Sequence, residues 1–150
     1  MMSNKAVTLV TSKAPMTQFR RVTDQFSVSP QIAVDDVAQA AAQGVVLIIN
    51  NRPDGEDPAQ PQGAEIEAAA RAAGLDYVAI PVRGGPDAAQ AQAQRQAVEA
   101  AQGPVLAYCR SGTRSIVTWA IGQAQSGVMD RQTLIALGAE AGYDLSGVLG

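Results

Sequence analysis

Short apolar segments alternate with alanine-rich segments along the chain, and this alternation restricts the fold more than any other feature of the sequence. The run at 45–49 is continuously apolar and predicts a strand that is buried on both faces. Apolar segments at 77–82 and 104–108 predict two more strands, and residues 19–22 and 26–28 fit two short ones. Helices are expected at 35–43, 64–73, 87–102, 115–125 and 130–141.

Repeated strand–helix units predict an α/β fold in which helices flank a mostly parallel central sheet. With 150 residues, the chain is long enough for one domain and too short for two ordinary ones. We expect a loose lead-in over residues 1–15 and a single domain over residues 16–150. Trp119, on the predicted helix 115–125, is expected to pack that helix on the sheet.

The composition excludes several kinds of chemistry. The chain has no histidine, which excludes Ser-His-Asp and Cys-His catalysis and any histidine-ligated metal. It has a single cysteine, Cys109, which excludes an intramolecular disulfide, a zinc site of several cysteines and an internal thiol relay. The acidic residues are scattered and form no obvious ligand set, so we expect neither a metal nor a cofactor.

Charge and hydropathy limit the partners. The formal net charge is −3, whereas a nucleic-acid-binding domain would show a basic face. No apolar run approaches the length of a membrane-spanning helix, and no signal peptide is evident at the N-terminus. We therefore expect a cytoplasmic protein that binds neither nucleic acid nor membrane, and the sequence identifies no protein partner.

Arginine follows each of the three central predicted strands, at Arg52, at Arg83, and at Arg110 with Arg114. The carboxyl ends of parallel strands meet at one edge of the sheet, where ligands of α/β proteins bind. A local basic region in an acidic protein therefore predicts a small anionic substrate.

The segment Cys109-Arg110-Ser111-Gly112-Thr113-Arg114-Ser115 lies between a predicted strand and a predicted helix. Backbone N–H groups of such a loop can turn inward and bind an anion at the helix N-terminus. Cys109 would lie at the base of this loop. The amides, the helix dipole and Arg114 would favour its thiolate, which is a nucleophile.

The other loop residues have predicted roles as well. Arg114 can hold two oxygens of a tetrahedral anion at once, and Ser115 can donate to the thiolate. Arg110, Ser111, Gly112 and Thr113 would surround the substrate, and Gly112 permits a backbone conformation that a side chain resists. The alternative is that Cys109 is a small buried apolar residue without a catalytic role.

A general acid is needed if the substrate is a phosphate ester. Asp54 and Asp87 follow the predicted strands, and Glu56 and Asp57 are further candidates. Asp54 could instead serve a turn, and Asp87 could instead cap a helix. Arg52 would contact the substrate or pair with an acidic neighbour, and Arg83 would lie at the rim.

The loop CRSGTRS after an apolar strand resembles the active-site loops of rhodanese sulfurtransferases and of cysteine-dependent phosphatases. The chain from about Phe26 to Ile121 resembles the phosphatase-like domain of beta-lactamase-hydrolase-like proteins. The resemblance implies a dual-specificity-phosphatase-like fold, with Cys109 as nucleophile and Arg114 as anion-binding residue. The matching stretches are 26–31, 48–56, 74–77, 80–82 and 108–115.

Members of that family are described both as phosphatases and as sulfur transferases, and the loop spacing separates the two reactions. Four residues lie between Cys109 and Arg114, which is the rhodanese spacing, whereas tyrosine phosphatases have five and usually a histidine where this chain has Tyr108. One hypothesis is phosphomonoester hydrolysis through a cysteinyl-phosphate. The alternatives are a sulfurtransferase with a Cys109 persulfide and a non-catalytic anion-binding module.

Overall fold

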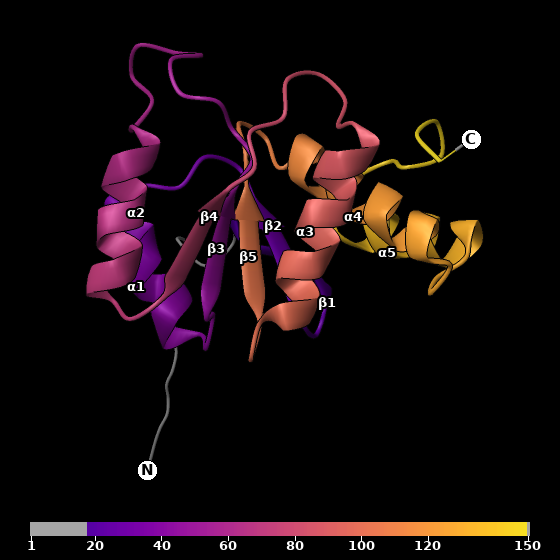
Figure 1. Ribbon diagram of the computed structural model, residues 1–150, viewed down its shortest axis with the longest axis horizontal. Coiled ribbons are helices and arrows are strands. Elements are labelled where there is room, and N and C mark those ends of the chain that lie inside the picture. Colours follow the sequence, from indigo (N-terminus) through magenta and orange to yellow (C-terminus); the bar gives the residue numbers. More distant parts are fainter. Residues whose placement is uncertain (1–17, 150) are drawn as a thin grey trace.

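The computed structural model describes residues 18–149 (Figure 1). The predicted lead-in at 1–15 lies outside the described residues. The strands are β1 (Arg20–Thr23), β2 (Phe26–Ser29), β3 (Leu47–Asn50), β4 (Asp76–Ala79) and β5 (Val105–Tyr108). The helices are α1 (Val34–Ala42), α2 (Gly63–Ala72), α3 (Ala88–Ala100), α4 (Thr113–Ser126) and α5 (Arg131–Glu140).

The strands form one sheet in the order β1-β2-β5-β3-β4. The pairs β2–β5, β5–β3 and β3–β4 are parallel, and β1 pairs antiparallel with β2 at the edge. The predicted α/β fold with a mostly parallel sheet is therefore confirmed. Because four strands are parallel, the loops after β2, β3, β4 and β5 all leave the sheet at the same edge.

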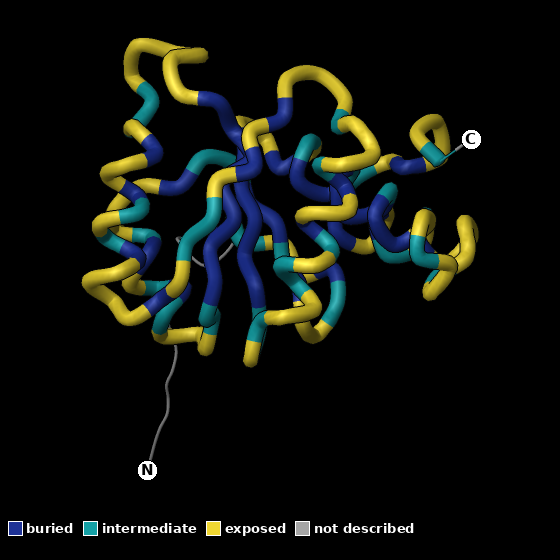
Figure 2. The backbone as a smooth tube through the Cα atoms, in the orientation of Figure 1, coloured by how far each residue is buried: buried dark blue, intermediate teal, exposed yellow. Residues whose placement is uncertain are grey.

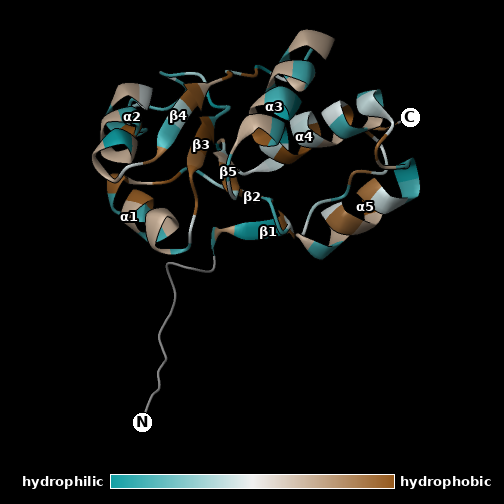
Figure 3. Cartoon of the chain, turned by 60° about the horizontal axis from the view of Figure 1, so that its bottom comes forward, coloured by the Kyte–Doolittle hydropathy of each residue, from teal (hydrophilic) through white to brown (hydrophobic). Residues whose placement is uncertain are grey.

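Helices cover both faces of the sheet (Figure 1). Helices α1 and α2 lie on one face, α3 and α4 lie on the other, and α5 lies beside α4 near β1 (Figure 1). The central strands are the deeply buried part of the chain (Figure 2) and are predominantly apolar (Figure 3). The structure explains the continuous apolar runs of the sequence, since a strand covered on both faces needs apolar side chains at every position.

Alternate residues of the central strands supply two separate apolar clusters. In β3, Leu47 and Ile49 face α4, whereas Ile48 faces α1 and α2. In β5, Val105 and Ala107 join the first cluster and Leu106 joins the second. This period of two follows from strand geometry and fixes the register of the sheet.

The predicted elements are all present, with boundaries shifted by a few residues. The strand expected at 45–49 is hydrogen-bonded as a strand over 47–50, and the one expected at 77–82 ends at Ala79. Trp119 is buried as predicted, and its ring stacks on that of Phe26 with centroids 5.5 Å apart. No helix within residues 18–149 has the length and apolar character needed to cross a membrane.

Helix α3 lies directly against α4, although its sequence is too polar to supply many apolar core residues. Its buried side chains are Ala91 and the polar Gln94. The close approach depends on Gly122 of α4, where a Cβ atom would lie 2.7 Å from the backbone oxygen of Ala91. The two helices can therefore touch only because position 122 has no side chain.

We predict that Gly122→Ala destabilises the protein by about 1–3 kcal/mol, because the added methyl group forces α3 and α4 apart. Chemical denaturation monitored by circular dichroism measures this loss. Gly147→Ala is the control, since a Cβ atom at position 147 meets nothing within 4 Å. Equal stability of the two variants would contradict the proposed close packing.

Candidate active site

The loop 109–112 connects the end of β5 to the start of α4 at the carboxyl edge of the sheet. Strand β5 lies in the middle of the sheet, so Cys109 enters the loop from a fully buried position. Gly112 has a φ of +90°, in the left-handed region that favours glycine. In this conformation the Gly112 N–H donates to Cys109 Sγ over 3.1 Å. The loop therefore directs a backbone donor at the sulfur, as the sequence predicts.

Arg114, in the first turn of α4, is held by two partners. Its Nη1 donates to Glu56 Oε2 at 2.8 Å and to the Val82 carbonyl at 2.9 Å, and its Nη2 donates to Glu56 Oε1 at 2.8 Å. The Glu56 bond raises the pKa of Arg114, and negative charge at Cys109 raises it further. These bonds use three of the five guanidinium N–H groups. One N–H on Nε and one on Nη2 lie outside these three bonds, and Arg114 also has a side-chain hydrogen-bond interaction with Cys109. An oxyanion at the loop could be bound by this pair.

Glu56 connects two arginines that are far apart in the sequence. Besides Arg114, its Oε1 accepts from Arg52 Nε at 3.1 Å. The hydrogen bonds from Arg114 and then from Arg52 lower the pKa of Glu56 to about 2. Glu56 is therefore ionised at neutral pH and holds no proton to donate, which argues against the general-acid role considered for it. Arg52, which was expected either to contact substrate or to pair, pairs with Glu56.

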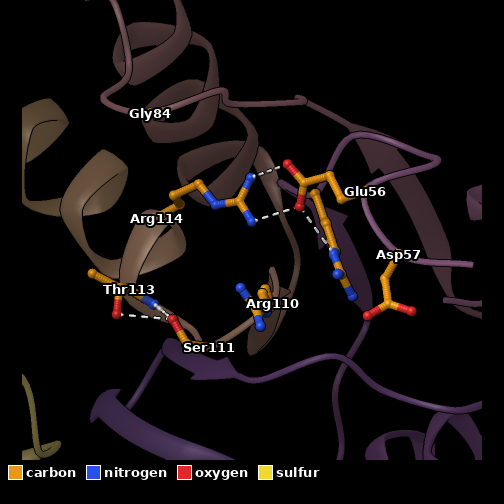
Figure 4. Close-up of a pocket in the computed structure, with 8 residues that line it drawn as sticks. Glu56, Asp57, Gly84, Arg110, Ser111, Thr113 and Arg114 are labelled. Atoms are coloured by element: carbon orange, nitrogen blue, oxygen red, sulfur yellow. Dashed lines mark hydrogen bonds and ion pairs between the residues drawn. The ribbon is translucent and has the colours of Figure 1, made fainter. Parts of the chain in front are cut away.

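A cavity of about 560 Å³ opens above the loop (Figure 4). The figure shows Arg114 and Glu56 joined directly by hydrogen bonds, with Asp57 near Glu56. Cys109 does not line this cavity, because its side chain is fully buried behind the loop. The lining residues are Arg52, Glu56, Asp57, Gly84, Arg110, Ser111, Thr113 and Arg114.

Two of the predicted acidic residues lie away from this cavity. Asp54 accepts from the Gly63 N–H at 2.8 Å and lines a neighbouring hollow with Tyr77. Asp87 caps α3, where its Oδ1 accepts from the Gln90 N–H at 2.7 Å. Asp87 thus caps a helix, as its cap alternative predicted. Asp54 instead bonds to the first amide of α2, nine residues away. Arg83 is exposed and does not contribute to the cavity, where its neighbour Gly84 takes part instead.

A buried polar network lies behind the loop, and sequence reasoning missed most of it. Asn51 Nδ2 donates to Gln94 Oε1 at 2.7 Å, and Gln94 Nε2 donates to the Ser115 carbonyl at 3.1 Å. All three residues are fully buried. These hydrogen bonds connect the residue that follows β3, through Gln94 of α3, to the first turn of α4. The Ser115 hydroxyl has no hydrogen-bond partner within the described residues, so it is available close to the nucleophile loop.

Tyr143, after α5, is a second residue that sequence reasoning missed. Its hydroxyl donates to the Ser111 carbonyl at 2.9 Å, so the C-terminal segment contacts the nucleophile loop directly. Burial raises the pKa of Tyr143, and negative charge at Cys109 adds to this effect. The hydroxyl therefore remains a hydrogen-bond donor at neutral pH.

The site offers cationic donors more readily than metal ligands. Within residues 18–149, no group of three or more Cys, Asp and Glu side chains is placed to hold a metal ion. Of the two carboxylates that line the cavity, Glu56 is already bound by two guanidinium groups. The arginines and the loop amides are thus the groups that would meet a ligand, and such groups bind anions.

The sheet, the loop and the arginine define a protein with the fold of the cysteine phosphatases. A solved structure of a candidate phosphatase from Neisseria meningitidis aligns with a TM-score of 0.76 and 33% identity, covering 85% of this chain and 91% of that one. The fold also matches TpbA of P. aeruginosa in complex with pTyr (TM-score 0.62, 18% identity, 93% of this chain and 79% of that one).

The family model for the phosphatase-like domain of beta-lactamase hydrolase-like protein matches residues 18–126, and the chain belongs to this family. A beta-lactamase hydrolase-like protein of Agrobacterium fabrum is 39% identical over 127 residues, which are 83% of this chain and 29% of that protein. A relative from Xylella fastidiosa is 39% identical over 125 residues, with the same coverage. The chain therefore spans less than a third of the length of these relatives.

The ion pairs of Glu56 predict a specific acid sensitivity. Its pKa falls from 4.5 to about 2 on folding, so its contribution to stability is complete above pH 4.5 and is lost as the pH falls toward about 2. In Glu56→Gln, we expect the free energy of unfolding to vary less with pH across this window than in the wild type.

Denaturation curves between pH 2 and pH 5 measure this dependence. Glu67→Gln is the matched control, because Glu67 pairs with Arg71 on the exposed face of α2. If Glu56→Gln and Glu67→Gln show the same pH dependence, the ion pairs of Glu56 with Arg52 and Arg114 do not form in solution.

Proposed function

We propose that the chain hydrolyses phosphomonoesters through a cysteinyl-phosphate at Cys109. The observation that carries the proposal is the Gly112 N–H directed at Cys109 Sγ, with the Arg114 guanidinium beside it. Both groups stabilise a thiolate and would also stabilise the equatorial oxygens of a phosphoryl group during transfer. The phosphatase-like family and the similarity to solved phosphatases support the same reaction class.

In the first step, the Cys109 thiolate attacks phosphorus and the ester P–O bond breaks. The loop amides and the Nε and Nη2 N–H groups of Arg114 would hold the phosphoryl oxygens. The leaving oxygen takes the bonding electrons and needs a proton. Asp57 is our candidate donor, because it lines the cavity with Arg114 whereas Asp54 and Asp87 do not. Its Oδ1 accepts from the Ala59 N–H at 2.8 Å.

In the second step, water attacks the cysteinyl-phosphate, the S–P bond breaks, and inorganic phosphate and the thiolate are released. The same acidic residue, now ionised, would accept the proton of the attacking water. Ser115 would donate to the departing sulfur, because its buried hydroxyl has no hydrogen-bond partner within residues 18–149. The products are one alcohol and one phosphate for each ester and water consumed.

The cavity lining carries three arginines and two carboxylates, and this excess of positive charge favours an anionic substrate. Arg52, Arg110 and Arg114 all line it. TpbA has been solved with pTyr and PTPMT1 with PI(5)P, and both share this fold. We therefore propose a phosphate ester as substrate.

The loop spacing supports sulfur transfer as a second candidate. Four residues separate Cys109 from Arg114, and a shorter loop encloses a smaller anion. Here the thiolate attacks the outer sulfur of thiosulfate, the S–S bond breaks, and sulfite leaves with the bonding electrons. Cyanide or a thiolate then attacks the outer sulfur of the Cys109 persulfide and restores the thiolate. This reaction needs no general acid.

The two reactions are separated by assays with p-nitrophenyl phosphate and with thiosulfate plus cyanide. We expect phosphate-ester hydrolysis that Cys109→Ser reduces to background and that Arg114→Ala lowers by about 10²–10³-fold. Sulfur transfer without ester hydrolysis, or a Cys109 peptide that carries one extra sulfur atom after purification, would favour the second candidate. If Arg114→Ala changes neither activity, the site is assigned wrongly.

The role of Asp57 has its own test. With phosphotyrosine, whose leaving group needs a proton, Asp57→Asn should lower kcat by about 10²-fold or more. With p-nitrophenyl phosphate the loss should be smaller, because nitrophenolate leaves readily without a proton. Asp54→Asn is the matched control, and a larger loss there than in Asp57→Asn would transfer the acid role to Asp54.

A further inference from the structure

The peptide group between Ser111 and Gly112 is held from both of its ends. Its N–H donates to Cys109 Sγ at 3.1 Å, and its C=O accepts from the Tyr143 hydroxyl at 2.9 Å. A trans peptide is planar, and its N–H and C=O point in opposite directions. A donor that fixes the carbonyl on the outside of the loop therefore also fixes the N–H on the inside, toward the sulfur.

The loop sequence does not enforce this orientation by itself. Gly112 has no side chain, so rotation of its peptide meets little steric resistance. The space beside it is occupied by Tyr143, since a Cβ atom at position 112 would lie 2.2 Å from the tyrosine hydroxyl. The Tyr143 hydroxyl thus leaves room only for glycine at position 112, and it also supplies the hydrogen bond that orients the 111–112 peptide.

Tyr143 is itself firmly placed. Its backbone N–H donates to the Gly138 carbonyl at 2.8 Å, which ties it to the last turn of α5. The Arg20 guanidinium lies 5.7 Å from the ring centroid, and Arg20 also donates to the Ala141 carbonyl at 3.3 Å. Two residues further on, Leu145 is fully buried in the core. The hydroxyl is therefore positioned by β1, α5 and the core together.

We propose that Tyr143 is a positioning residue of the active site, which orients the 111–112 peptide so that the Gly112 amide stabilises the Cys109 thiolate. This inference rests on the proposed nucleophilic role of Cys109. It assigns a function to the segment after α5, which lies beyond the residues 18–126 matched by the family model.

The test is the titration of Cys109 in Tyr143→Phe, which keeps the ring and removes only the hydroxyl. Cys109 is the single cysteine, so the thiolate absorbance in the ultraviolet comes from this residue alone. The background from other groups is removed by subtracting the titration curve of a matched protein that also carries Cys109→Ser. We expect the midpoint to rise by about one pH unit, because a charge-assisted hydrogen bond is weakened. Amide exchange at Gly112, followed by NMR, should become faster.

Tyr77→Phe is the matched control, since the Tyr77 hydroxyl is also hydrogen-bonded, to Asn50 Nδ2 at 2.9 Å, on the other side of β3. In Tyr77→Phe, the midpoint of the Cys109 titration should stay at the wild-type value. The inference is overturned if Tyr143→Phe shifts the midpoint no more than Tyr77→Phe does while both proteins remain folded by circular dichroism.

The titration does not depend on turnover, so failure of this inference can be told from failure of the proposed function. If wild-type protein hydrolyses no phosphate ester but Tyr143→Phe still shifts the midpoint, the proposed reaction is wrong and the positioning role stands. If hydrolysis depends on Cys109 and the midpoint does not move, the positioning role alone is wrong.

Discussion

The direction of one peptide group, between Ser111 and Gly112, decides what the site can do. With its N–H turned toward Cys109 Sγ, the loop presents a donor to a sulfur that is otherwise fully buried. Burial without such donors would disfavour the charged thiolate, because a low-dielectric environment penalises an isolated charge. The position of Gly112 between β5 and α4, its left-handed backbone and the contact with Tyr143 all serve this one orientation. The loop therefore presents a backbone donor to a buried sulfur at the carboxyl edge of the sheet.

The second requirement is a guanidinium group in a fixed position. Glu56 binds one side of Arg114 and also binds Arg52, so a single carboxylate holds two cations at the edge of the cavity. Like-charged side chains this close would repel one another without an anion between them. Arg114 also interacts with the side chain of Cys109, so the same guanidinium group connects Glu56 to the nucleophile loop. Glu56 thus preorganises the site electrostatically, which reduces the reorganisation needed when an anion binds.

Local patterns of the sequence predicted most of the fold and the centre of the site. The apolar runs placed β3 and β5, and the order strand–CRSGTRS–helix placed Cys109 and Arg114 at the carboxyl edge of the sheet. The supporting residues could not be predicted, because their roles depend on contacts between distant segments. Glu56 lies 58 residues before its partner Arg114, and Tyr143 lies 32 residues after Ser111. Gln94 lies in a segment rich in alanine and glutamine, and the close packing of α3 on α4 buries it beside Asn51. Asp54 and Asp87 show the converse difficulty, since turns, caps and catalysis all use aspartate.

The central claim is that Cys109 becomes covalently bonded to phosphorus during turnover. Rapid quenching of the reaction with p-nitrophenyl phosphate in denaturant, followed by mass spectrometry of the Cys109 peptide, tests it most directly. The account predicts a peptide that is heavier by one phosphoryl group during turnover and unmodified in its absence. Continued turnover with an unmodified Cys109 peptide at every quench time, or undiminished turnover by Cys109→Ser, would contradict it.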